Sequence, residues 1–195
     1  MLPLNKPQIT RREALEKYLP ERSIDECLLL GVRGYYLNTM GERNKNDRAI
    51  YDDAIFIISP SIFLSYNANT DPSRYGINAK INKGMAVLQA GEYLYQIGKH
   101  GINRERQTNG RVKAYTALVQ KSPVNVLRDG KNSIESGMFA INIHRGGNTT
   151  TSSEGCQTIH PVQWDEFISI VQGEMKRLKQ KDIKYILVEE NEKRK

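Results

Sequence analysis

Short runs of apolar residues, separated by Gly, Pro, Asn and Asp, make up most of the chain. Runs of this length that end at turn-forming residues are typical of β-strands with buried side chains. We expect a strand at residues 28–36, interrupted by two glycines, and further strands at residues 54–58, 63–66, 85–88, 92–97, 115–119, 124–127 and 185–188. Many short strands with turns at this spacing predict a barrel or sandwich and not a parallel α/β sheet.

Two other segments carry the spacing of apolar residues that is typical of helices. Residues 10–19 form a short amphipathic pattern, in which Thr10 and Glu13 have the spacing of a capping box and Pro20 ends the helix. The second helix begins at Pro161. Its apolar stripe consists of Trp164, Phe167, Ile168, Val171, Met175 and Leu178. The expected fold is therefore mainly β (α+β), a many-stranded barrel or sandwich with a C-terminal amphipathic helix.

Three polar or alternating segments connect these elements. Residues 67–72 predict a loop by their Asn, Asp and Pro content, and residues 99–112 predict an exposed basic loop. Residues 138–144 alternate between apolar and other side chains, which predicts a strand with Asn142 and His144 on one face.

The chain is basic, with a net charge of +7 and an isoelectric point near 9.4. Such a chain is attracted to polyanions, which include nucleic acid, anionic membranes and bacterial wall polymers, and charge alone does not choose among them. The apolar runs are too short to span a bilayer. Residues 1–20 contain no apolar run, so we expect no secretory signal and synthesis in the cytoplasm.

Two cysteines, Cys27 and Cys156, are the whole complement of thiols. They form neither a disulfide framework nor a zinc motif, and no phosphate-binding or dinucleotide-binding loop is present, so we expect no metal and no cofactor.

Cys156 follows Gly155 in a polar loop between an expected strand and the C-terminal helix, and His144 lies upstream at the end of that strand. A neighbouring histidine can activate a thiol as a nucleophile. Taken by themselves, these two residues are better explained as a buried free cysteine and a surface histidine.

The residues around the pair favour the catalytic interpretation. The segment His144-Arg145-Gly146-Gly147, followed by Ser153-Glu154-Gly155-Cys156, resembles the signature of L,D-transpeptidase catalytic domains. In that family, a His-x-x-Gly stretch ends one strand and a Ser-x-Gly-Cys stretch carries the nucleophile. The resemblance covers residues 141–159, and one departure is Glu154, where family members usually have His.

The resemblance implies a role for each residue of the motif. Cys156 would attack a peptide carbonyl and His144 would take the thiol proton as the base. Ser153 and Gly155 would shape the turn around the cysteine, where backbone groups hold the oxyanion. We place Arg145, Gly146, Gly147, Asn142 and Gln157 among the substrate-binding residues.

Several of these residues have a second interpretation. Arg145 can hold a substrate carboxylate or be an ordinary surface arginine. Asn142 shares a face with His144 and can orient it. His160 fits a helix cap, and His100 has no partner visible in the sequence. The pair Asp52-Asp53 is not expected to form a two-carboxylate site, because adjacent strand residues point to opposite faces.

The expected activity is acyl transfer or hydrolysis on peptidoglycan stem peptides through a thioacyl-enzyme at Cys156. An amine acceptor would make the protein a transpeptidase, and water would make it a carboxypeptidase or endopeptidase. We expect a catalytic domain at residues 23–190, preceded by a helical extension at 1–22 and followed by a basic tail at 191–195.

The expected partner is peptidoglycan, with no membrane span and no nucleic acid, while the oligomeric state is open. The absent signal implies action in the periplasm or wall after lysis or delivery by a secretion system, as in a phage or effector protein. Two alternatives stay open. One is a non-catalytic basic module on the same scaffold that binds wall polymer or nucleic acid. The other is a cysteine hydrolase of another amide.

Overall fold

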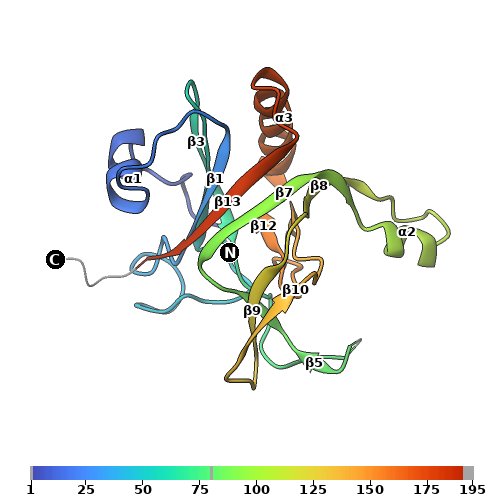
Figure 1. Ribbon diagram of the computed structural model, residues 1–195. Helices are drawn as coiled ribbons and strands as arrows, with labels where there is room; N and C mark the ends of the chain where they lie inside the picture. Colours follow the sequence, from blue (N-terminus) through green and yellow to red (C-terminus); the bar gives the residue numbers. More distant parts are fainter. Residues whose placement is uncertain (1, 80, 191–195) are drawn as a thin grey trace.

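Eight strands of the computed structural model, which describes residues 2–79 and 81–190, close into a barrel (Figure 1). Their order around the barrel is β1 (Leu28–Arg33), β13 (Asp182–Glu189), β7 (Gly91–His100), β8 (Tyr115–Gln120), β11 (Ile143–Arg145), β12 (Gln157–Ile159), β3 (Phe63–Asn69) and β2 (Asp53–Ile58). Two of the neighbouring pairs, β1 with β13 and β11 with β12, are parallel, and the others are antiparallel. The prediction of a mainly β fold with a C-terminal helix is confirmed.

Every residue of β1 and of β2 is buried, on both faces of the sheet. Side chains such as Leu29 and Ile55 belong to the main core, which also contains the apolar side of α3 (Pro161–Arg177). Side chains on the opposite face of the two strands, such as Leu30 and Phe56, pack in a second cluster with Leu15 of α1 (Arg11–Tyr18). Burial on both faces explains why these strands appear in the sequence as continuous apolar runs.

Both helices predicted from the sequence are present. Thr10 caps α1 through the expected capping box with Glu13. Pro161 stands in the first turn of α3, whose predicted apolar stripe is buried at Trp164, Phe167 and Val171. The N-terminal segment also contacts the barrel directly, because Arg11 donates hydrogen bonds to the carbonyls of Ser59 and Ile62.

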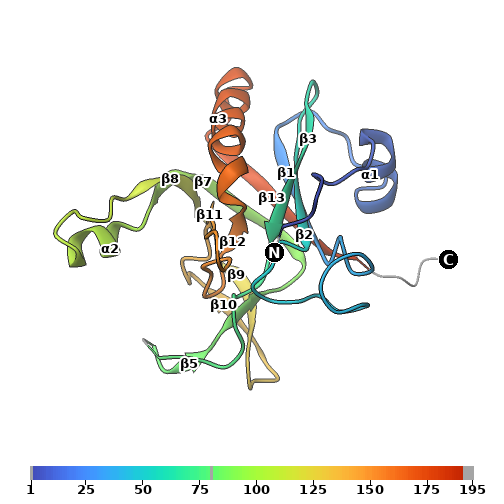
Figure 2. The same cartoon turned by 180° about the vertical axis from the view of Figure 1, so that it is seen from behind.

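Smaller elements extend from the barrel. Strands β6 (Ala86–Leu88), β9 (Val124–Arg128) and β10 (Ile134–Gly137) form a three-stranded sheet, and β4 (Ile77–Asn78) pairs with β5 (Lys83–Gly84). A turn at Asp129-Gly130 joins β9 to β10, and Gly130 has the positive φ of 76° that such turns favour. An arm formed by the ends of β7 and β8 carries α2 (Ile102–Gln107) at its tip, away from the barrel (Figures 1 and 2).

Four local predictions were wrong in part. The strand expected at residues 28–36 ends at Arg33, and Gly34, with a φ of 74°, begins a turn. Residues 67–69 continue β3 instead of forming a loop, because they pair with β2 on one side and with β12 on the other. Residues 99–112 are not all loop, since they contain the end of β7 and α2. Of the strand expected at residues 138–144, only the last two residues belong to β11. Ala140 has a φ of 56°, and the Gln120 side chain takes the place of a strand partner by accepting from Phe139 and Ile141.

The expected basic tail at residues 191–195 lies outside the described residues. Within residues 2–79 and 81–190, no helix is long and apolar enough to cross a bilayer.

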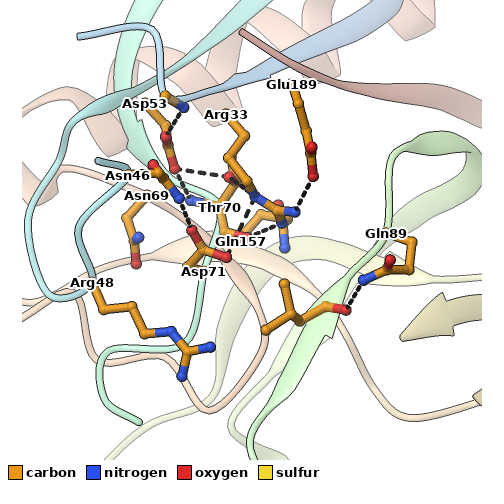
Figure 3. Close-up of polar contacts among 12 residues, drawn as sticks. Arg33, Asn46, Arg48, Asp53, Asn69, Thr70, Asp71, Gln89, Gln157 and Glu189 are labelled. Atoms are coloured by element: carbon orange, nitrogen blue, oxygen red, sulfur yellow. Dashed lines mark hydrogen bonds and ion pairs between the residues drawn. The ribbon is translucent and has the colours of Figure 1, made fainter. Parts of the chain in front are cut away.

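A buried polar network ties the ends of β1, β2 and β3 together inside this fold (Figure 3). Arg33 donates to the hydroxyl and carbonyl of Thr70 at 3.0 and 2.7 Å and lies 3.4 Å from Asp71. Asp53 accepts from the backbone of Gly34 at 2.5 Å and from the backbone of Thr70 at 2.6 Å. These carboxylates therefore hold strand ends and do not line an open cleft.

Asp52 and Asp53 are both buried beside each other, and this sets their protonation. Burial and the neighbouring Asp53 raise the pKa of Asp52, and burial and the charge of Asp71 raise the pKa of Asp53. One oxygen of Asp52 is buried without a hydrogen-bond partner. A carboxyl group whose folded-state pKa is raised binds its proton more tightly in the folded protein than in the unfolded chain.

We therefore expect stability to fall as the pH rises from about 4, where an unfolded Asp ionises, through neutrality. Urea unfolding at about pH 5 and about pH 8 should give a lower free energy of unfolding at the higher pH. Asp52→Asn should reduce this difference by about 1 kcal/mol or more, since each unit of pKa shift corresponds to about 1.4 kcal/mol. An unchanged difference in Asp52→Asn would contradict this origin of the pH dependence.

Candidate functional site

His144 lies on β11, and Cys156 immediately precedes the neighbouring strand β12, although a loop separates the two residues in the sequence. In the parallel pair of β11 and β12, His144 stands opposite Thr158 and Ile143 opposite Gln157. Cys156 comes one residue before β12, and its sulfur lies 3.4 Å from the backbone nitrogen of Asn142, which donates to it. The thiol lies 3.4 Å from the Ala140 carbonyl, to which it donates. His144 is thus two residues along the chain from Asn142, whose nitrogen donates to the sulfur, and the side chains of both residues contact His100.

His144 is 4% exposed and its orientation is set by its own strand. Its Nδ1 atom lies 2.8 Å from the Arg145 carbonyl, which can only accept. Nδ1 therefore carries the proton, and the lone pair of neutral His144 is on Nε2. The Tyr115 hydroxyl, 3.3 Å from both Nδ1 and the Arg145 carbonyl, supports the same arrangement. A histidine oriented by a third group is one part of the pattern that activates a nucleophile.

Burial keeps both members of the pair uncharged in the resting protein. Burial, and next the proximity of His100, lower the pKa of His144 to about 3. Burial raises the pKa of the Cys156 thiol to about 11, against the hydrogen bond from Asn142 and with a contribution from the charge of Glu154. Both groups are therefore neutral near pH 7, and the resting protein does not hold a preformed thiolate–imidazolium pair.

The Ser-x-Gly-Cys turn is built by Ser153. Its hydroxyl donates to the Cys156 carbonyl at 2.6 Å and accepts from the Gly155 nitrogen at 3.0 Å. Gly155 has a φ of 149°, and a Cβ there would lie 2.7 Å from the Ala86 carbonyl oxygen. Ser153 and Gly155 thus shape the turn. The resemblance implies that backbone groups of this turn hold the oxyanion, but the N–H of Gly155 donates to the Ser153 hydroxyl.

Gly146 and Gly147 let the loop between β11 and β12 pack closely. A Cβ on Gly146 would lie 2.1 Å from the Tyr51 hydroxyl, and one on Gly147 would lie 2.5 Å from the Thr150 carbonyl oxygen. The Tyr51 hydroxyl donates to the Gly147 carbonyl at 2.7 Å. The atoms that approach these two glycines closely belong to the protein itself. Contact of either glycine with a substrate therefore stays a prediction.

The three other expected substrate-binding residues differ in how far their side chains are exposed to solvent. Arg145 is exposed, with its guanidinium 4.9 Å from the centre of the Tyr115 ring, and is free to meet a carboxylate. Asn142 is nearly buried, and its side chain bonds the Gln120 nitrogen and His100 instead of His144. Gln157 is fully buried, accepts from the Tyr185 hydroxyl and donates to the Gly155 carbonyl. Because its amide is used in the core, Gln157 supports the turn and has no access to a substrate.

Sequence reasoning missed two members of the site, His100 and Tyr115. They are paired across the ends of β7 and β8, and the rings of His100 and His144 are stacked with centroids 3.9 Å apart. No local motif surrounds either residue, because each reaches His144 only through strand pairing. His160 is the cap of α3, as predicted, and accepts from the Val162 nitrogen.

A groove of about 1650 Å³ lies elsewhere, between α1 and residues 35–40, and contains none of these side chains. Among the described residues, no three His, Cys, Asp or Glu side chains are grouped so that they could hold a metal ion. The sequence matches no protein-family model, no curated protein and no solved structure.

The charge state of Cys156 can be measured directly. We expect the rate of iodoacetamide alkylation at Cys156 to be low at neutral pH and to rise with a midpoint well above the value near 8.5 of a free thiol, because burial disfavours the thiolate. His144→Ala should leave this midpoint nearly unchanged, since His144 is neutral. Peptide mass spectrometry distinguishes Cys156 from the fully buried Cys27, which should stay unmodified in the folded protein. A midpoint well below 8.5 that disappears in His144→Ala would instead show a preformed ion pair.

Proposed function

We propose that this protein is a cysteine-dependent acyltransferase or peptidase that acts on bacterial peptidoglycan stem peptides. The observation that carries the proposal is the placement of Cys156 beside the strand of His144, whose Nδ1–H is held by the Arg145 carbonyl. The motif that resembles L,D-transpeptidases supplies the substrate class. The same proposal includes action outside the cytoplasm, in the periplasm or wall.

The proposed reaction proceeds in two steps. Nε2 of His144 takes the thiol proton as the Cys156 sulfur attacks a peptide carbonyl carbon. The C–N bond then breaks, the departing amine receives the proton from His144, and a thioester remains on Cys156. An amine or a water molecule attacks the thioester, gives its proton to His144, and releases the acyl group as the thiol is restored.

Charge near the pair favours an anionic substrate. Arg145 is exposed beside Tyr115, and both Arg145 and Arg104 act electrostatically on that tyrosine. A guanidinium can bind a carboxylate with two parallel hydrogen bonds, and stem peptides carry carboxylates. We therefore assign Arg145 to substrate binding.

The proposal predicts a covalent intermediate. Incubation with purified muropeptides should add the mass of an acyl group to Cys156, detected by mass spectrometry of the intact protein and its peptides. Cys156→Ala should abolish the adduct, and His144→Ala should slow its formation by about 100-fold or more, the usual contribution of a general base. Cys27→Ala is the matched control and should react normally. If no adduct and no product form while a panel of unrelated amides is cleaved, the substrate class is wrong.

A second candidate function is a binding module for anionic wall polymer. It is favoured by the exposed cations of the β7–α2–β8 arm, which are Lys99, Arg104, Arg106, Arg111 and Lys113. Co-sedimentation with purified sacculi that weakens with salt and is unchanged in Cys156→Ala, without any turnover, would favour this function over catalysis.

A further inference from the structure

A second histidine covers one face of the candidate base. His100 is the last residue of β7, and its ring lies on the His144 ring at 3.9 Å between centroids, with 15° between the planes. His100 is 42 residues from Asn142 in sequence, yet the two side chains are 3.2 Å apart. The stack therefore depends on strand pairing and not on the loop that carries Cys156.

Asn142 determines which nitrogen of His100 carries a proton. The Oδ1 atom of Asn142 accepts from the Gln120 backbone nitrogen at 3.1 Å, so its NH₂ group is the part that faces Nδ1 of His100. An amide NH₂ can only donate, and Nδ1 must therefore accept. His100 is thus neutral, with its proton on Nε2.

We infer that His100 is a positioning residue for His144, held neutral by Asn142 so that its ring fixes the plane of the base and shields one face of it from water. The inference rests on the proposed function only where it calls His144 a base. The stack and the hydrogen bonds to Asn142 are independent of the reaction.

A neutral His100 has a consequence for the proposed reaction. When His144 takes the thiol proton, its positive charge arises against an uncharged ring, whereas a protonated His100 would place a like charge at stacking distance and oppose the transfer. Burial lowers the pKa of His100, in agreement with the neutral form that Asn142 requires. Among the described residues, the other titratable or charged groups close to the two histidines are Tyr115, which contacts His144, and Arg145, which lies over the Tyr115 ring.

Asn142→Asp tests the assignment of the His100 proton. A carboxylate keeps the bond from Gln120 but can only accept from His100, so Nδ1 should become protonated. We expect ¹⁵N spectra of the full chain at neutral pH to show an unprotonated Nδ1 on His100 in the wild type and a protonated Nδ1 in Asn142→Asp. A protonated Nδ1 in the wild type would overturn the inference.

His100→Ala and His100→Phe test the effect on His144. Burial is the largest cause of the low pKa of His144, so removal of the covering ring should raise this pKa by at least one unit towards its usual value. Phenylalanine restores a flat ring that cannot be charged and should keep the pKa low. NMR titration of the His144 ring measures its pKa in the wild type and in both variants, and thermal melting confirms that the variants fold.

The rate of acylation supplies the second readout. In His100→Ala the acidic limb of the pH profile should move up by the same one unit or more as the His144 pKa, so that the loss relative to wild type grows as the pH falls below about 5 and is smaller at about pH 8. His100→Phe should keep the wild-type profile. A His144 titration that is the same in wild type and His100→Ala overturns the inference. If titration shifts as expected but no variant forms an adduct, the positioning role stands and the proposed function fails.

Discussion

The candidate site depends on the parallel pairing of β11 with β12 inside an otherwise mostly antiparallel barrel. Two parallel neighbours need a connection that returns to the same end of the sheet, and residues 146–156 make it. Gly146 and Gly147 allow that connection to pack against Tyr51 and against itself, while Ser153 closes its last turn. The pairing brings Cys156 to the strand of His144, and antiparallel β8 on the other side of β11 brings Tyr115 to the same histidine.

Burial decides the chemistry of the groups that this pairing assembles. It favours the neutral forms of Cys156 and His144, and hydrogen bonds then specify where the remaining protons are. The Arg145 carbonyl requires a proton on Nδ1 of His144, and the Asn142 amide requires its absence from Nδ1 of His100. Two stacked imidazoles in the same protein therefore carry opposite tautomers, which leaves Nε2 of His144 as the nitrogen available for a base.

Other buried polar residues of the barrel hold the scaffold of the site. Gln120 accepts from two backbone nitrogens of the segment before β11, and its own backbone nitrogen donates to Asn142. Gln157 bonds the Gly155 carbonyl from inside the barrel. Because each buried amide satisfies backbone groups that have left the regular ladder, these residues make an irregular turn possible next to a closed sheet.

The β-rich class, both predicted helices with their caps and most of the strands could be read from the amino-acid sequence, as could the motif with His144 and Cys156, because periodicity, capping and turn chemistry are local. Other features follow only from tertiary contacts. They are the positions of His100 and Tyr115 beside His144, the hydrogen bonds of Asn142 and Gln157 inside the protein, and the end of the strand pattern at Ala140. Each depends on a partner far away in the chain, and strand register is set by packing of the whole barrel. Local patterns carry no information about which strands become neighbours.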